Sequence, residues 1–192
     1  GFLIAMAIER WDLHRRVALH TVRVVGVSPR RLVLGFMLAT AFLSAWISNT
    51  AAAMMMVTIG LAVLSQLDRD GQGDGALGTT LMLSIAYAAS IGGLATLIGT
   101  PPNAILAGVL ESRYGYHIGF ARWMSFGVPL SLLLLALSWW YLTRWVLGPQ
   151  RKGPDDGDQV IVQALQGLGP MTAQEWRVLL VFGLVVLGWL LQ

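Results

Sequence analysis

Cysteine is absent from this sequence and charged residues are scarce. The lack of cysteine excludes a disulfide framework and a thiolate metal site. Only 12% of the 192 residues are Asp, Glu, Lys or Arg, about half of the share of roughly 25% that is usual in soluble domains. Hydrophobic residues make up 56% of the chain. This composition argues against a soluble protein of any kind.

Long stretches of the chain carry no charge at all. Such runs occupy residues 32–66, 75–110, 123–143 and 178–192. Each run exceeds or approaches the roughly 20 apolar residues that cross the hydrocarbon core of a bilayer. The sequence therefore predicts an all-α integral membrane protein in contact with the lipid bilayer. No set of nucleophile, base and acid lies inside these runs, so neither an enzyme nor a nucleic-acid partner is expected.

The first segment, 1–31, holds six of the thirteen basic residues. Apolar residues recur at helical spacing on one side of it. This pattern predicts the end of a membrane segment followed by a basic amphipathic helix at a charged leaflet. Since the first residue is Gly1 and the last, Gln192, falls inside an apolar run, we expect the chain to be a fragment whose true N-terminus is missing.

Segment 32–67 predicts a re-entrant helical hairpin. Its apolar part, Leu32–Leu64, would reach about 50 Å as one straight helix, against a hydrocarbon core of about 30 Å. The polar triplet Ser48-Asn49-Thr50 divides it into arms of 16 and 14 residues, and neither arm comfortably spans the core. Two short arms that meet at a polar tip near the middle of the bilayer satisfy this pattern.

Segment 76–111 predicts a broken transmembrane helix. The break is expected at Gly99-Thr100-Pro101-Pro102-Asn103, because two adjacent prolines remove two backbone donors and push Thr100 out of the helical region. Residues 122–147 then predict an ordinary transmembrane helix, 148–175 a cytoplasmic loop, and 176–192 the truncated start of the next transmembrane helix.

The distribution of basic residues supports the hairpin. If the hairpin returns to its starting side, the loops at 1–31, 65–74 and 144–177 share one side and carry six, one and four basic residues. Only Arg113 and Arg122 then lie on the other side. The positive-inside rule prefers this arrangement, so the hairpin is expected to enter from the cytoplasm.

The two interruptions together predict an ion site. Asn49 offers a neutral carbonyl oxygen suited to sodium, Ser48 and Thr50 offer hydroxyls, and Ser44 lies one helical turn before Ser48. Backbone amides near Thr50, at the start of the second arm, point toward a carboxylate or another oxyanion. A purely structural role for both polar interruptions is the alternative.

Three blocks carry a family resemblance: FLIAMAIERWDLHRRVAL, WISNTAAAMMM and GGLATLIGTPPNAI. In order and spacing the chain resembles the divalent anion:sodium symporter family, which takes up dicarboxylates, citrate or sulfate with sodium. The resemblance implies one inverted repeat of a two-repeat, elevator-type transporter that works as a homodimer. It departs from the family where Ala51-Ala52-Ala53 follows Thr50, and no second Ser-Asn-Thr is present.

Carried over residue by residue, the resemblance implies a first sodium site at Ser48, Asn49 and the backbone around Gly99, with Ser44 as a further ligand. It implies that Ser48, Asn49 and Thr50 meet the small divalent anion and that Thr100 and Pro101 line the same cavity. Sodium is the expected coupling ion, and a bacterial inner membrane the expected location. Alternatives are an arsenite or proton-coupled permease of similar plan and a membrane scaffold or enzyme subunit that transports nothing.

Overall fold

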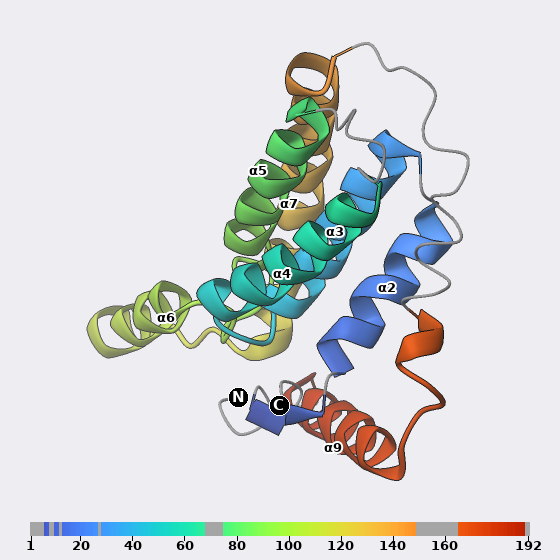
Figure 1. Ribbon diagram of the computed structural model, residues 1–192. Helices are drawn as coiled ribbons and strands as arrows, with labels where there is room; N and C mark the ends of the chain where they lie inside the picture. Colours follow the sequence, from blue (N-terminus) through green and yellow to red (C-terminus); the bar gives the residue numbers. More distant parts are fainter. Residues whose placement is uncertain are drawn as a thin grey trace.

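The structure is a computed structural model, and it describes residues 6–7, 10–11, 13–26, 28–67, 75–148 and 165–190. All regular secondary structure in this part of the chain is helical, without a strand, which confirms the predicted all-α class. The elements, shown in Figure 1, are α2 (Leu13–Val25), α3 (Pro29–Ser44), α4 (Asn49–Leu67), α5 (Gly75–Gly92), α6 (Pro101–Tyr114), α7 (Phe120–Tyr141), the π-helix η1 (Leu142–Val146) and α9 (Ala173–Leu190).

Helix α3 lies at the centre of the packing. It contacts α2, α4, α5 and α7, and most of its residues are buried. Small residues allow the close approach of its neighbours: a Cβ atom on Gly35 would lie 2.9 Å from the Cα atom of Val22, and one on Gly92 would lie 2.5 Å from the Cα atom of Ala41. Glycine at these two positions therefore brings α2 and α5 into backbone contact with α3.

Helix α2 lies in the basic first segment and buries one face. Leu13, Ala18, Leu19 and Val22 are buried, and α2 packs along α3. The predicted end of a membrane segment at the start of the chain falls partly on residues 1–5, which lie outside the described residues.

The first interruption joins α3 to α4. The chain leaves the helix at residues 45–48 and becomes helical again at Asn49. We expected the gap at Ser48-Asn49-Thr50, so it lies about three residues earlier. The reason is that Ser48 caps α4: its carbonyl accepts a hydrogen bond from the Ala52 amide at 3.0 Å, and its hydroxyl accepts one from the Ala51 amide at 3.3 Å.

The second interruption separates α5 from α6. Helix α5 ends at Gly92, residues 93–100 are irregular, and α6 begins at Pro101. As predicted, Thr100 is extended, with φ −144° and ψ 143°, but the gap begins earlier than the expected Gly99. Pro101 and Pro102 belong to the first turn of α6, where a missing N–H leaves no intrahelical bond unmade.

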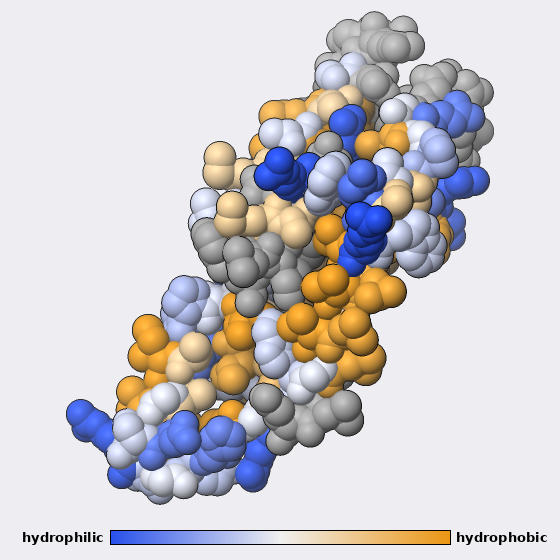
Figure 2. Space-filling view, turned by 90° about the horizontal axis from the view of Figure 1, so that it is seen from below, coloured by the Kyte–Doolittle hydropathy of each residue, from blue (hydrophilic) through white to orange (hydrophobic). Residues whose placement is uncertain are grey.

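Two described helical stretches are long and apolar enough to cross a membrane: α5, and the continuous run Phe120–Val146 formed by α7 and η1. Large apolar side chains are exposed on the outer helices, among them Ile105, Phe126, Leu133, Leu180 and Leu184. Figure 2 shows hydrophobic residues gathered across the middle of the face seen from below. Exposed apolar surface of this extent fits contact with lipid or with further protein.

Candidate ion-binding site at two helix interruptions

The side chains of Ser44 and Asn49 meet at the turn between α3 and α4. Ser44 is fully buried, and its Oγ lies 2.7 Å from Asn49 Oδ1 and 2.6 Å from the carbonyl oxygen of Ala89 in α5. A hydroxyl group carries one hydrogen, so it donates to only one of these oxygens at a time. Three neutral oxygens therefore converge at one buried point, and oxygen is the ligand that hard cations prefer.

The second interruption lies directly against Asn49. A Cβ atom on Gly93 would overlap Asn49 Oδ1 and would lie 3.0 Å from Asn49 Cγ. A Cβ atom on Gly99 would in turn lie 2.6 Å from the carbonyl oxygen of Gly93. Asn49, Gly93 and Gly99 are thus stacked in contact, which brings the two helix interruptions together.

Polar side chains hold the irregular segment 93–100 in place. The Asn103 amide nitrogen donates to the carbonyl oxygens of Gly93 at 2.8 Å and Thr96 at 2.9 Å. The Thr96 hydroxyl donates to the Ala45 carbonyl at 2.5 Å and so ties this segment to the α3–α4 turn. Asn103 and Thr96 are both buried. They supply donors to the backbone carbonyls of Gly93 and Ala45, and Asn103 adds a second donor to the Thr96 carbonyl, which also accepts from the Gly99 amide at 3.4 Å.

Helix α7 supports both the end of α5 and the irregular segment that follows it. Ser131 donates to the Ile91 carbonyl at 3.0 Å, and the Trp123 indole donates to the Leu94 carbonyl at 3.1 Å. Gly127 lies between them, where a Cβ atom would come within 2.7 Å of the Leu94 carbonyl oxygen. The irregular segment is therefore fixed by contacts from three elements.

The proline pair leaves carbonyl groups open near the site. A helical donor for the Gly99 carbonyl would come from residue 102 or 103, but Pro102 has no N–H and the Asn103 amide bonds to Thr100 at 3.1 Å. No other hydrogen bond to the Gly99 carbonyl is formed by the described residues. Its lone pairs are available to a cation, as at broken helices that coordinate ions.

The start of α4 offers donors of the opposite polarity. The backbone amides of Asn49 and Thr50 have no acceptor among the described residues, since Ser48 pairs only with Ala51 and Ala52. Free amides at a helix N-terminus, together with the helix dipole, favour an anion. The arrangement can thus attract a cation at Asn49 Oδ1 and an anion at the amides of the same turn.

The structure places the predicted residues in two groups. Ser44, Asn49 and the backbone around Gly99 are brought together in the interior. Ser48, Thr50 and Pro101 are exposed and Thr100 is half-buried, and no hydrogen bond joins their side chains to the buried group. The exposed set lies at the two helix starts, where a ligand could reach it.

Sequence reasoning missed three contributors: Ala89, Thr96 and Asn103. Asn103 closes the Thr-Pro-Pro-Asn motif and precedes an apolar arm, so its buried polar side chain could have been found from that position. Ala89 and Thr96 carry no local signal, because only the packing of α5 against α3 selects them.

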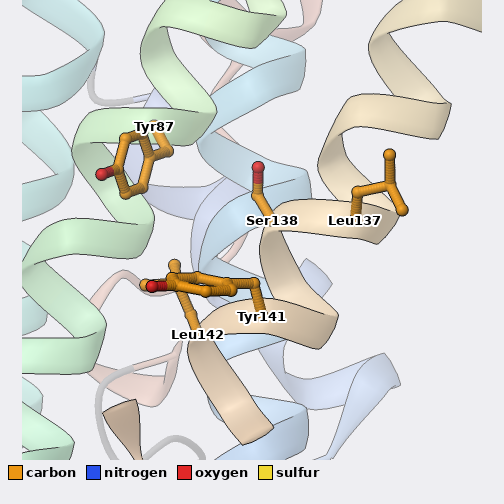
Figure 3. A pocket seen from close by; sticks show the side chains of 5 residues that line it. All are labelled: Tyr87, Leu137, Ser138, Tyr141 and Leu142. Atoms are coloured by element: carbon orange, nitrogen blue, oxygen red, sulfur yellow. The ribbon is translucent and has the colours of Figure 1, made fainter. Parts of the chain in front are cut away.

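A separate cavity of about 260 Å³ lies between α5 and α7. Figure 3 shows Tyr87 of α5 across from Ser138 and Tyr141 of α7, and Leu137 and Leu142 complete the lining. None of the residues around Asn49 and Gly93 lines it. The oxygen cluster, rather than this hollow, is the candidate ion site.

Comparison with known proteins gives a consistent picture. The family described as sodium:sulfate symporter transmembrane region matches residues 1–192. A sodium-dependent dicarboxylate transporter of Staphylococcus saprophyticus is 44% identical over 196 residues, and one of Staphylococcus aureus strain USA300 is 42% identical over the same length. Each alignment covers 99% of this chain and 38% of the relative. The chain therefore spans less than half the length of these relatives.

Proposed function

Because the chain belongs to the sodium:sulfate symporter family, and is thereby part of an integral membrane protein, we propose that it serves in a secondary active transporter. This transporter couples sodium entry to the uptake of a divalent anion: a dicarboxylate, citrate or sulfate. The two similar staphylococcal proteins are named as sodium-dependent dicarboxylate transporters, which favours a dicarboxylate.

In this proposal sodium binds between the two interruptions. Its ligands are Ser44 Oγ, Asn49 Oδ1 and the backbone carbonyl of Gly99, and Ser48 contributes from the turn. The convergence of the Ser44, Asn49 and Ala89 oxygens is the observation that carries the proposal. Neutral oxygens suit a monovalent ion, because a carboxylate at this depth would have to be desolvated.

The divalent anion binds at the same turn, on the exposed side. The amides of Asn49 and Thr50 face it, and the side chains of Ser48, Thr50, Thr100 and Pro101 line its cavity. Sodium is coordinated by the lone pairs of the neutral oxygens at the turn. Its positive charge then attracts the anion. The anion binds the sodium-loaded turn with higher affinity than the sodium-free turn. By linkage, the anion raises the affinity for sodium by the same factor, and this couples the binding of the two.

The larger mechanism follows the family resemblance. We propose that α3 and α4 form a re-entrant hairpin that enters from the cytoplasm of a bacterial inner membrane. The hairpin and the broken helix α5–α6 move together as part of a transport domain, in elevator fashion, within a homodimer. Contacts between the two interruptions support their motion as one body, since Asn49 packs against Gly93 and the Thr96 hydroxyl donates to the Ala45 carbonyl.

The test is uptake by the full-length protein in proteoliposomes carrying Asn49→Ala. We expect sodium-dependent succinate or sulfate uptake to be lost, because a central oxygen ligand is removed. Thr58→Ala, an exposed threonine of α4 whose hydroxyl bonds only to the Met55 carbonyl, is the matched control and should transport normally. Unchanged uptake by Asn49→Ala would refute the site, and undiminished uptake by the wild type in choline would refute sodium coupling.

A further inference from the structure

Arg16 joins α2 to the chain segment that precedes α9. Its side chain is only 10% exposed, and its Nε atom lies 3.1 Å from Glu175 Oε1. The same guanidinium donates to the carbonyl oxygens of Gly169 at 2.9 Å and Leu168 at 3.2 Å. A buried guanidinium with this many acceptors is held firmly, so the turn at residues 165–169 has a fixed position against α2.

Glu175 is held as firmly on its side. It accepts hydrogen bonds from the Thr172 amide at 2.6 Å and the Thr172 hydroxyl at 3.1 Å, while its own amide donates to that hydroxyl at 3.3 Å. This is a capping box at the start of α9. Burial raises the pKa of Glu175, but the hydrogen bonds from Thr172 and Arg16 outweigh it and the pKa lies below its usual value. The carboxylate stays charged and neutralises Arg16.

The fixed turn and α2 border an open cavity of about 320 Å³ at the surface. This volume lies at the lower end of the range for small-molecule pockets, roughly 300–1,000 Å³. The lining residues are Arg16, His20, Arg23, Leu165, Gln166 and Gly169. The three basic residues follow one another at spacings of four and three along α2, so they lie on a single face of the helix.

Positive charge at this cavity exceeds negative charge. Arg16 is paired with Glu175, whereas no carboxylate of the described residues pairs with Arg23 or His20. Arg23, His20 and Gln166 are exposed and present hydrogen-bond donors at the cavity mouth. We propose that this cavity binds a phosphate group, either free in solution or carried by the headgroup of an anionic lipid.

Phosphate suits these donors for a geometric reason. The planar guanidinium of Arg23 can donate two parallel hydrogen bonds to phosphate oxygens, and the imidazole of His20 and the amide of Gln166 can reach the remaining ones. Arg16 acts as a positioning residue, because most of its donors are taken up by Glu175 and the turn. This site is separate from the oxygen cluster at Asn49 and does not depend on the proposed function.

The test uses the purified full-length protein in choline buffer, where a sodium-dependent site is not loaded. Its thermal unfolding is followed while inorganic phosphate is raised, with chloride at equal ionic strength as the control for screening. A ligand that binds the folded state stabilises it by an amount that grows with the logarithm of its concentration above Kd, so the melting temperature keeps rising as ligand is added. We expect phosphate to do so, and the phosphate concentration that gives a fixed rise in melting temperature to increase about fivefold in Arg23→Gln, as for the loss of one exposed charge pair.

Arg113→Gln is the matched control, because it removes the same charge at the exposed end of α6. A second arm places each protein in nanodiscs of phosphatidylcholine alone or with phosphatidylglycerol. If Arg23→Gln reduces the stabilisation by free phosphate, the ligand is a soluble phosphate. If Arg23→Gln lowers the melting temperature only in nanodiscs that contain phosphatidylglycerol, the ligand is a lipid headgroup. The proposal is overturned if chloride stabilises as well as phosphate, or if Arg23→Gln and Arg113→Gln respond alike in both arms.

Discussion

Gly93→Ala tests the contact between the two helix interruptions most directly. A Cβ atom at residue 93 would overlap Asn49 Oδ1 and would lie 3.0 Å from Asn49 Cγ and Nδ2, whereas ordinary contacts begin near 3.4 Å. The obstructing atoms belong to the end of a side chain rather than to the backbone. The Asn49 amide must therefore move by several tenths of an ångström, while the helices around it can stay in place.

The size of the effect follows from the cost of overpacking. An extra methyl group in a packed interior costs about 1–3 kcal/mol. If this whole cost appears as a loss of sodium-binding free energy, because the displaced Asn49 amide is a sodium ligand, the sodium affinity falls by about 5- to 150-fold. A ligand displaced by about 0.5 Å already leaves the range that a metal site tolerates. We expect the sodium concentration for half-maximal uptake to rise accordingly.

The assay is the sodium dependence of anion uptake by the full-length protein in proteoliposomes. Gly78→Ala is the matched control in α5, because its Cβ atom would meet Leu64 Cδ1 at an ordinary 3.8 Å. Gly92→Ala supplies the opposite control: its Cβ atom would strike the backbone of Ala41, so the protein should lose stability and not only sodium affinity.

The reasoning would be refuted by a particular pattern of results. If Gly93→Ala folds with the wild-type melting temperature and keeps the sodium dependence of Gly78→Ala, Asn49 does not bind sodium in the arrangement described. A loss of folded protein in Gly93→Ala would show that the backbone, rather than Asn49, takes up the strain.

Three further outcomes are expected. Asn103→Leu leaves the Gly93 carbonyl without its donor and the Thr96 carbonyl with only the Gly99 amide at 3.4 Å, and should lower the unfolding free energy by about 1–3 kcal/mol, measured by denaturant titration in detergent. Arg16→Met leaves the Glu175 carboxylate buried and unpaired, costing about 3–5 kcal/mol, and Arg16→Met with Glu175→Met should recover most of it; a double variant no better than the single one contradicts this. Because the pKa of Glu175 is lowered in the folded state, its contribution to stability is fully present above its unfolded-state pKa and is lost as the pH falls through the folded pKa. Glu175→Gln should therefore flatten the acid side of the stability profile.

Local signals in the sequence determined that the helices are interrupted near Ser48 and near Thr100, although not where each gap begins. Pro101 and Pro102 act through steric exclusion and missing donors on their immediate neighbours, so the extended Thr100 and the open Gly99 carbonyl follow from sequence alone. The scarcity of charge likewise indicated membrane helices. Asn49 was recognisable as part of the polar break, and Ser44 because it lies one helical turn before Ser48.

Only the tertiary structure decided how the two interruptions fit together. Ser44 and Ala89 are 45 residues apart, and Thr96 and Ala45 are 51 apart, so no local preference can pair them. The second gap begins at Gly93 rather than Gly99, and there Gly92 brings α5 against the backbone of Ala41 while Gly93 receives the side chain of Asn49. Both positions depend on the distance between α3 and α5, which is set by packing across the whole interface and not by any short stretch of residues.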